Sequence, residues 1–381
     1  MSEEDLEPLE LDDENLDSFE TIEAVEELGL SEDSVLPEDF EKDDAEHEAL
    51  GEAFSPPPWL TASYEKMPEP IAIVDGSLSL TYLYQNPLFH KFLERYKLGA
   101  HRSLIASIWN QVDKSVIEAL RQATHDPDSG FSWKGEINVK TRDTLTALIK
   151  LHLYPFIEES GGREGPRAFW IYLEDITAER QQLQRDYIDA LLKASLQKDN
   201  DTGKHVTRVN RYSQCLAEAL YHDGRWPRVD RDFIEDISYL AAMHDVGKIG
   251  ISEAILYKPG PLNEQEWKEM REHPIIGALI LSSYPIKMAQ EIAKSHHEKW
   301  NGSGYPYNLS ETNIPLSARI VTIADVYDAL RMRRSYKPGF EHGVSVSRIA
   351  DDAGTHFDPD LVGVFVAMAE DFRRIFDSNE D

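Results

Sequence analysis

The order of apolar and polar positions predicts two different architectures along this chain. In the first, short apolar runs bounded by turn residues predict strands, and a helical pattern interrupts them. The predicted strands are residues 68–77, 80–84, 131–139, 145–155 and 168–173, and the helical pattern covers residues 88–96. Two strands, then helices, then three strands indicate an α/β domain over residues 55–177.

The second architecture begins with a helix predicted over residues 178–198. Leu183, Tyr187, Leu191 and Leu192 recur there at helical spacing, with charged residues opposite. This helix joins the two halves of the chain. It either pairs with its copy in a parallel homodimer or packs on the helices that follow.

Residues 199–381 also have a helical pattern, and loops are expected at the Gly/Pro clusters near residues 258–263, 301–315 and 335–344. The expected fold class is therefore α+β with several domains. An α/β domain precedes an all-α helical bundle, in which inward-pointing side chains are able to hold metals.

The charge of the chain is concentrated at its N-terminus. The formal net charge is −31; residues 1–54 contain 23 Asp/Glu and one Lys, which leaves −22 there and −9 on the remaining residues. Too few apolar residues accompany these acids to form a core, so a disordered acidic tail is predicted. Such a tail either remains solvated or docks on a basic partner or on its own domain.

The overall composition restricts partners and location. The acidic balance argues against long nucleic acids, which would be repelled. The single cysteine, Cys215, excludes an internal disulfide and favours a reducing cytoplasm. The sequence shows neither a basic-then-apolar signal nor the ~20 apolar residues that span a bilayer, so no membrane association is expected.

Histidines and aspartates in the C-terminal half supply the candidate chemistry. They are His205, His244, Asp245, His273, His296, His297 and Asp325. Imidazoles and carboxylates bind divalent transition metals. The set is too large for one tetrahedral zinc. It suits two six-coordinate metals that share a bridging carboxylate and leave positions open for substrate.

The motifs around these residues resemble a known family. The longest are AAMHDVGKIGI at 241–251, HHEKWNGSGYP at 296–306 and IPLSARIVTIADVYDAL at 314–330. Shorter ones are KPG at 258–260, HPIIG at 273–277 and GTHFDP at 354–359. Together they resemble the HD-GYP family of bacterial cyclic dinucleotide phosphodiesterases over about residues 199–366.

The resemblance implies a metal-dependent enzyme that hydrolyses cyclic di-GMP to pGpG, and it leaves open whether pGpG or GMP is the end product. It implies that His205, His244, Asp245 and Asp325 hold one metal, that Asp245 bridges, and that His273, His296 and His297 complete the second. Asp201 stands where some members hold a third metal; its alternative role is a helix N-cap. Iron and manganese are the metals expected of such a site.

The resemblance also assigns residues outside the metal ligands. Lys248 would neutralise charge on the phosphate, and Asp328 would orient the water or assist proton transfer. The loop at residues 302–306, with Gly304 and Tyr305, and the segment at 333–337, with Arg334 and Lys337, would bind the substrate.

The sequence departs from the family pattern at a few positions. Asn301 and Asn308 replace the usual Asp and Gly, and Arg331-Met332 replaces Thr-Ser. Every implied metal ligand is present, so activity is expected; the departures fall instead on the loop and on the segment that would contact the substrate. Two alternatives stay open: a phosphodiesterase for another cyclic dinucleotide, and a weakly active cyclic dinucleotide receptor or docking protein.

The α/β domain resembles a PAS sensor domain in its order of elements, in Asn86-Pro87 after the second strand and in EDIT at 174–177. We expect it to dimerise or to sense a small ligand. No cofactor is expected, because each candidate haem ligand is better explained as an ordinary histidine. These candidates are His90, His101, His125 and His152.

Overall fold

The computed structural model describes residues 55–99, 101–126, 130–141, 143–156, 168–198, 203–332 and 339–378. The acidic segment 1–54 lies outside the described residues, so its predicted disorder stays a prediction.

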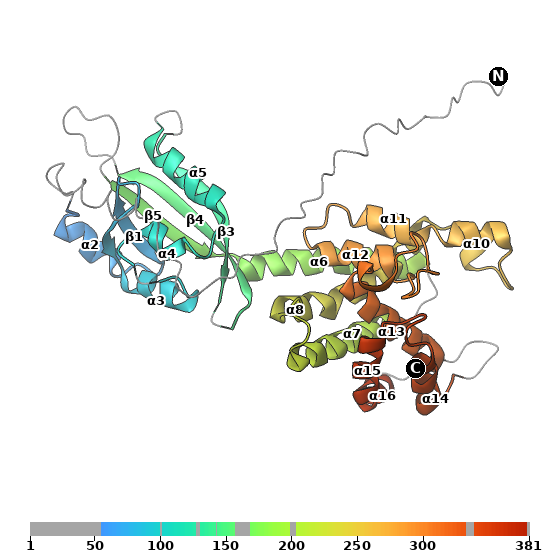
Figure 1. Ribbon diagram of the computed structural model, residues 1–381. Coiled ribbons are helices and arrows are strands. Elements are labelled where there is room, and N and C mark those ends of the chain that lie inside the picture. Colours follow the sequence, from blue (N-terminus) through green and yellow to red (C-terminus); the bar gives the residue numbers. More distant parts are fainter. Residues whose placement is uncertain are drawn as a thin grey trace, which may run out of the picture.

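The N-terminal domain is built on an antiparallel sheet. Its strands are β1 (Ile71–Asp75), β2 (Tyr82–Gln85), β3 (Trp133–Lys140), β4 (Thr146–Phe156) and β5 (Ala168–Asp175), in the order β2-β1-β5-β4-β3 (Figure 1). All of them lie where apolar runs predicted strands. The last strand in sequence therefore pairs with the first, in the centre of the sheet.

Helices cover both faces of this sheet because its side chains alternate between them. Ala72 and Val74 join the core formed with α3 (Pro87–Arg95), α4 (Leu104–Ile108) and α5 (Lys114–His125). Ile73, on the opposite face, packs with Leu60 of α2 (Pro58–Tyr64). This arrangement is the α/β architecture expected from the order of the elements; we call it the sensor domain after the role that we propose for it below.

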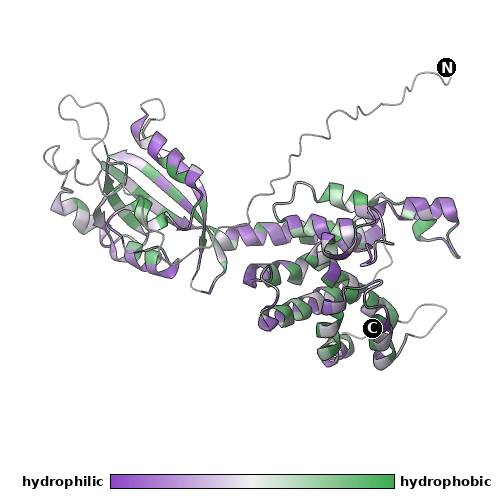
Figure 2. Ribbon diagram, viewed as in Figure 1, coloured by the Kyte–Doolittle hydropathy of each residue, from purple (hydrophilic) through white to green (hydrophobic). Residues whose placement is uncertain are grey.

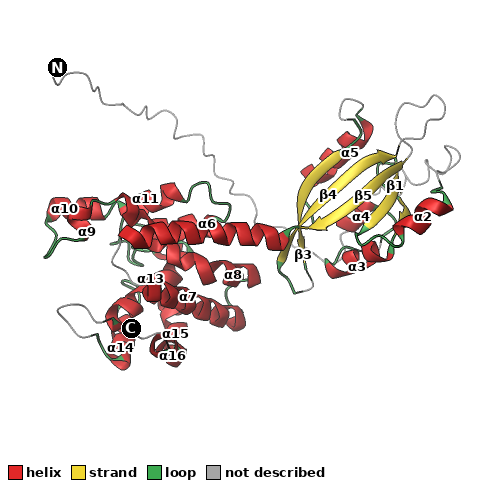
Figure 3. Cartoon of the chain, turned by 180° about the vertical axis from the view of Figure 1, so that it is seen from behind, coloured by secondary structure: helices red, strands yellow, loops and turns green. Residues whose placement is uncertain are grey.

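The helix α6 (Thr177–Lys198) leaves the sheet directly after β5 (Figure 3). Asp175 accepts hydrogen bonds from the backbone and the hydroxyl of Thr177, and the same hydroxyl oxygen accepts from Leu148 N–H at 2.9 Å. Because β5, β4 and the first turn of α6 are joined in this way, the sheet sets the direction of the helix.

The predicted apolar stripe of α6 divides into two parts. Leu191 and Leu192 pack against the core of the helical bundle that follows. Leu183 and Tyr187 are 67% and 44% exposed. The ring of Tyr187 stacks on Tyr284 of the bundle, with centroids 5.7 Å apart. From Tyr187 onward the stripe therefore fits the expectation that α6 packs on the bundle, and Leu183 remains exposed.

The C-terminal domain is the helical bundle expected from the sequence. It contains α7 (Gly203–Asp223), α8 (Arg231–Leu240), the 3-10 helix η3 (Ala241–Gly250), α9 (Glu253–Leu256), α10 (Glu264–Met270), α11 (His273–Ile280), α12 (Lys287–Ser295), η4 (Glu311–Asn313), α13 (Leu316–Arg331), α14 (His342–Asp351), α15 (Pro359–Ala367) and α16 (Ala369–Asp377). Hydrophobic and hydrophilic positions alternate along these helices (Figure 2), and the apolar ones form one core. None of the described helices combines the length and the apolar character needed to cross a bilayer.

The sensor domain also contacts the bundle through the end of its β3–β4 hairpin. The carboxylate of Asp232, in the first turn of α8, accepts from Thr146 N–H at 2.9 Å, from the Thr146 hydroxyl at 2.6 Å and from Lys140 Nζ at 2.7 Å. Since α8 continues directly into η3, this contact joins the sheet to the segment that carries His244 and Asp245.

Candidate metal centre

The structure brings together histidines and aspartates from five parts of the bundle. They are His205 on α7, His244 and Asp245 on η3, His273 at the start of α11, His296 and His297 directly after α12, and Asp325 on α13. We call this set the His/Asp cluster. Its potential ligand atoms fall into two groups, each within 4.8 Å: His205, His244 and Asp325 in one, and Asp245, His273, His296 and His297 in the other.

Asp245 lies between the two groups. Its Oδ2 is 3.2 Å from Nε2 of His244, in the first group. Its Oδ1 is 3.3 Å from Nε2 of His273 and 3.6 Å from Nε2 of His296, in the second group. One carboxylate thus presents one oxygen to each group, which is the geometry that a bridge between two cations requires.

Backbone carbonyls orient the imidazoles of the cluster. Nδ1 of His244 lies 2.9 Å from Ala241 O, and Nδ1 of His273 lies 2.6 Å from Met270 O. Nδ1 of His296 lies 3.1 Å from Ala293 O. A carbonyl only accepts, so each Nδ1 carries a proton and each Nε2 is directed into the cluster. Metal-binding histidines are commonly held in this way.

One further observation, an unpaired nitrogen of His244, indicates that the cluster binds a divalent cation. Nε2 of His244 is buried and has no hydrogen bond of normal geometry, although Asp245 is nearby. An unsatisfied buried nitrogen among carboxylates is costly unless a cation shares its lone pair. The donor atoms, their directions and this unsatisfied nitrogen therefore fit a divalent metal.

The charges of the cluster favour the ligand forms of Asp245 and His297 and, without a metal, the protonated form of His244. Burial alone would raise the pKa of Asp245, but Lys248 and His244 hold it well below its usual range. Burial and the neighbouring His296 lower the pKa of His297, so that its imidazole is neutral. Burial would lower the pKa of His244, but Asp245 and Asp325 outweigh it and raise this pKa to about 9. A cation next to both carboxylates would compete directly with that proton.

Asp328 occupies a different place from the one expected. It is fully buried, and its Oδ2 accepts from Nδ1 of His205 at 2.8 Å. Its Oδ1 accepts from Nε of Arg208 at 2.7 Å, and Arg208 is also fully buried. Both oxygens are therefore engaged by protein groups, which leaves Asp328 suited to orienting His205 rather than to contacting a water at the reacting phosphate.

Close packing of backbone brings η3 and α11 together. A Cβ on Gly247 would lie 1.9 Å from the carbonyl oxygen of His273 and 2.4 Å from the nitrogen of Gly277. Only glycine permits this approach. Gly247, two residues after Asp245 in the HD motif, therefore lets the two groups of the His/Asp cluster meet.

The loop after His297 folds back over the cluster. Tyr305 stacks on the His297 imidazole, with ring centroids 4.6 Å apart and 25° between the planes. A Cβ on Gly304 would approach Glu298 Cα to 2.5 Å and the His297 carbonyl oxygen to 2.6 Å, so glycine is needed at this position. Lys248 reaches the cluster from the other direction, with its Nζ 2.8 Å from Asp245 Oδ2.

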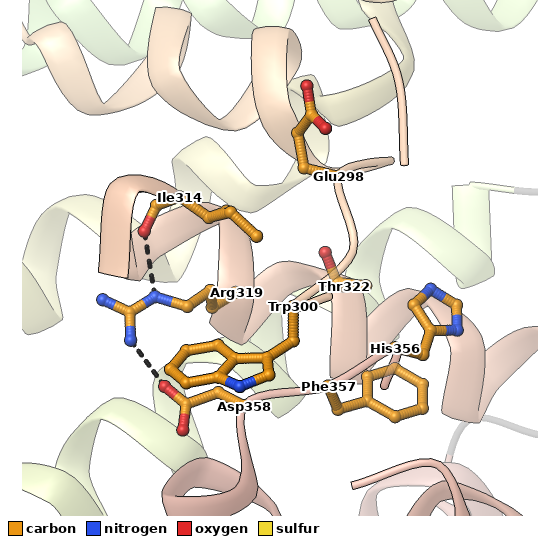
Figure 4. A pocket seen from close by; sticks show the side chains of 8 residues that line it. All are labelled: Glu298, Trp300, Ile314, Arg319, Thr322, His356, Phe357 and Asp358. Atoms are coloured by element: carbon orange, nitrogen blue, oxygen red, sulfur yellow. Dashed lines mark hydrogen bonds and ion pairs between the residues drawn. The ribbon is translucent and has the colours of Figure 1, made fainter. Parts of the chain in front are cut away.

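A buried acid and a small cavity support this loop. Glu298 is 2% exposed and accepts from the backbone N–H groups of Tyr307 and Leu309. Figure 4 shows the cavity of about 10 Å³ beside it, where Arg319 donates to Ile314 O and to the Asp358 carboxylate. These contacts fix the chain on both sides of the loop.

Sequence reasoning identified the cluster but not its supporting residues. Arg208, Glu298 and Arg271, whose guanidinium lies 5.3 Å from the centre of the Tyr305 ring, were not predicted. Glu298 could have been found, because it follows His296-His297 directly. Arg208 and Arg271 look like ordinary helix-surface cations in the sequence. Three predicted site residues, Asp201, Arg334 and Lys337, lie outside the described residues.

Comparison with known proteins identifies the C-terminal part of the chain. The sequence profile of the HD domain family matches residues 196–361, a range that contains every member of the His/Asp cluster. A cyclic di-GMP phosphodiesterase of Vibrio cholerae is 40% identical over 315 residues, which cover 80% of this chain and 59% of that protein. This match is longer than the bundle and therefore extends into the sensor domain.

Other relatives match a shorter part of the chain. A cyclic di-GMP phosphodiesterase of Thermotoga maritima is 33% identical over 211 residues, 55% of each chain. A 3'3'-cGAMP-specific phosphodiesterase 2 of Vibrio cholerae is 37% identical over 201 residues, which cover 52% of this chain and 37% of that protein. The chain thus spans between 37% and 59% of the length of these relatives.

Proposed function

We propose that this chain, whose residues 196–361 form an HD domain with the HD-GYP motifs, is a metal-dependent phosphodiesterase that hydrolyses cyclic di-GMP. The observation that carries the proposal is the placement of Asp245 between two groups of imidazoles and carboxylates. Such paired sites suit in-line displacement at phosphorus. Relatives named as cyclic di-GMP phosphodiesterases support the substrate.

In this proposal, His205, His244 and Asp325 hold one divalent transition metal, and His273, His296 and His297 hold a second. Asp245 bridges them. Asp201 would add a third, and iron or manganese are the metals that we propose. The metals, when bound, activate the attacking water and stabilise charge on the phosphate.

The other residues of the site position the substrate and balance the charge. Water adds to phosphorus, the bond to the 3′ oxygen breaks, and one proton of the water ends on that oxygen, which gives pGpG; the same reaction on pGpG gives GMP. Lys248 sits 2.8 Å from Asp245 and is placed to accompany negative charge growing on the phosphate. Asp328 orients His205 through Nδ1.

Substrate recognition is proposed for the loop with Gly304 and Tyr305 and for Arg334 and Lys337. Tyr305 stacks on His297, so its ring lies beside the cluster, where it could contact a base of the substrate. Arg334 and Lys337 follow α13 in the sequence and lie outside the described residues, so their part in this proposal rests on the sequence motif alone.

We further propose that the sensor domain, residues 55–177, regulates the HD domain, residues 199–381, through the linker helix 178–198 and the hairpin contact at Asp232. The linker presents Leu183 as an exposed apolar residue, which supports a parallel homodimer along the N-terminal half of α6. Cys215 is the single cysteine, and a cytoplasmic location is proposed.

The test measures metal content and turnover together. Purified protein reconstituted with iron or manganese is assayed on cyclic di-GMP, 3'3'-cGAMP and pGpG, with elemental analysis of the same samples. Turnover of cyclic di-GMP above 3'3'-cGAMP is expected. The opposite preference would favour the second candidate function, a 3'3'-cGAMP phosphodiesterase. This candidate is considered because one relative is named as an enzyme specific for that substrate.

Two variants test the site itself. His244→Ala and Asp245→Ala are each expected to lose turnover and bound metal at once, because each change removes a donor at the centre of the cluster. His222→Ala, at the far end of α7, is the matched control and should keep both. Normal turnover with normal metal content in Asp245→Ala would refute the assignment of the site.

A further inference from the structure

Arg271 lies at the edge of the His/Asp cluster and has no assigned role. It follows α10 directly and stands two residues before His273. Its guanidinium lies 5.3 Å from the centre of the Tyr305 ring, and the same ring stacks on His297. The three side chains therefore form a row that leads from the cluster toward solvent.

The surroundings of Arg271 leave its charge available. Within the part of the chain that the structure describes, no carboxylate forms an ion pair with Arg271, and the residue is exposed. Lys248, the other cation near Tyr305, is already paired with Asp245. Arg271 is thus a cation held next to a metal-binding cluster without a protein counter-charge, in a chain whose net charge is −31.

The Tyr305 ring also orients the guanidinium. Packing of a guanidinium on an aromatic ring restricts its rotation and leaves its N–H groups at the edge free to donate. Tyr305 is itself fixed, because its backbone N–H donates to the His297 carbonyl at 3.2 Å. A planar, oriented set of donors suits a phosphate oxygen better than a mobile lysine would.

We propose that Arg271 binds the second phosphodiester of the substrate, the one that is not being cleaved. A cyclic dinucleotide carries two phosphodiesters in one ring. When one lies at the His/Asp cluster, the other must lie nearby as a full negative charge. Arg271 is the described, unpaired cation on the path outward from His297. This inference rests on the proposed function, because it requires a substrate with two phosphates.

The inference separates Arg271 from the residues that act on any phosphodiester. Removing Arg271 should weaken binding of a substrate with two phosphates and should not affect hydrolysis of one with a single phosphate. Bis(4-nitrophenyl) phosphate is a suitable single-phosphate probe, because it offers a phosphodiester to the cluster and nothing beyond it. The comparison of the two substrates in one variant is therefore the decisive measurement.

The experiment compares the wild-type chain, Arg271→Ala, Arg271→Lys and Lys268→Ala, each with its metal content measured. Lys268 is an exposed cation on α10, one turn before Arg271. Lys268→Ala therefore removes the same charge outside the row of Arg271, Tyr305 and His297. For Arg271→Ala, KM for cyclic di-GMP and its calorimetric dissociation constant should rise roughly ten- to a hundredfold, with kcat nearly unchanged. Arg271→Lys should recover part of the loss, and Lys268→Ala should resemble wild type.

The possible results separate this inference from the proposed function. Equal losses on both substrates, or a loss of metal in Arg271→Ala, would mean that Arg271 merely supports Tyr305, and the inference would be wrong. Unchanged binding of cyclic di-GMP would also refute it. If wild type hydrolyses bis(4-nitrophenyl) phosphate but neither binds nor cleaves a cyclic dinucleotide, the proposed function fails, and the inference fails with it.

Discussion

At the scale of single residues, the side chains that hold the ligands of the His/Asp cluster in position matter as much as the ligands themselves. Asp328 has two roles: it accepts a hydrogen bond from Nδ1 of His205, and it neutralises the charge of buried Arg208. A buried guanidinium that loses its carboxylate costs about 3–5 kcal/mol, because its charge is left without compensation. Second-layer partners of this kind also affect metal affinity by about 10–100-fold.

Asp328→Asn should therefore lower both stability and metal affinity. The variant keeps the shape of the side chain but removes its charge, so we expect a loss of about 3–5 kcal/mol in the free energy of unfolding. Denaturant titration and metal titration measure the two effects. Asp175→Asn is the control, because it weakens the hydrogen bonds from Tyr96 and Thr177 in the N-terminal domain and should cost stability alone. Unchanged metal affinity in Asp328→Asn would contradict the orienting role.

These residues show how far the sequence alone could go. The cluster was predictable because its histidines and aspartates stand in short motifs, and the structure places all of those described in two adjoining groups. The role of Asp328 was not, because its partners His205 and Arg208 are 123 and 120 residues away. No local pattern marks which carboxylate on α13 faces the cluster and which faces Arg208.

A titratable carboxylate at the domain junction gives a prediction about pH. Burial, together with Asp232, Glu235 and Asp230, raises the pKa of Asp236 to about 7, and Arg185 opposes this only in part. The unfolded pKa is about 3.9. The folded state therefore holds the proton more tightly, so the stability contribution is complete below about pH 4 and is lost as pH rises through about 7.

Asp236→Asn should remove this dependence. Each pKa unit corresponds to about 1.4 kcal/mol, and partial solvent access reduces the total to on the order of 1–2 kcal/mol. The variant should gain that amount over wild type at pH 8 and little at pH 4. Denaturant unfolding at the two pH values measures it. An equal difference between variant and wild type at both values would show that Asp236 does not titrate in this range.

At the scale of elements, the meeting of η3 with α11 decides whether the cluster forms. Strands and helices were predictable from alternation and from helical spacing, since each pattern is local. The close backbone contact was not, because Gly247 has meaning only once His273 and Gly277 are known to lie against it. The 3-10 form of η3 was likewise not predicted, since it depends on the same packing.

Gly247→Ala tests this contact. The added methyl would overlap two backbone atoms of α11, so η3 and α11 must separate, at a cost on the order of 1–3 kcal/mol or more. We expect lower metal content together with a lower unfolding temperature. Gly363→Ala, in α15, meets no atom within 4 Å and should be neutral or slightly stabilising. Full metal content in Gly247→Ala would mean that the two groups of the cluster tolerate the separation.

At the scale of the whole molecule, the negative charge is concentrated in the N-terminal segment, whereas cations lie beside the His/Asp cluster. Residues 1–54 carry −22, whereas Lys248 and Arg271 are cations beside the cluster. The segment lies outside the described residues, but its composition alone makes it a competitor for an anionic substrate. Such competition acts between exposed charges and weakens with salt, because the Debye length is ~8 Å at physiological ionic strength.

Deleting residues 1–54 should therefore leave a folded, metal-loaded enzyme whose activity at low salt exceeds that of the full chain. The core of the sensor domain is built from residues that follow Leu60, so the deletion removes none of its described packing. The two forms are compared at low and high salt with cyclic di-GMP, and their activities should converge at high salt as the charges are screened. Loss of folding or of metal on deletion would make the segment structural. Equal activity at both salts would exclude competition by charge and leave a spacer or a docking segment, whose partner would have to be basic.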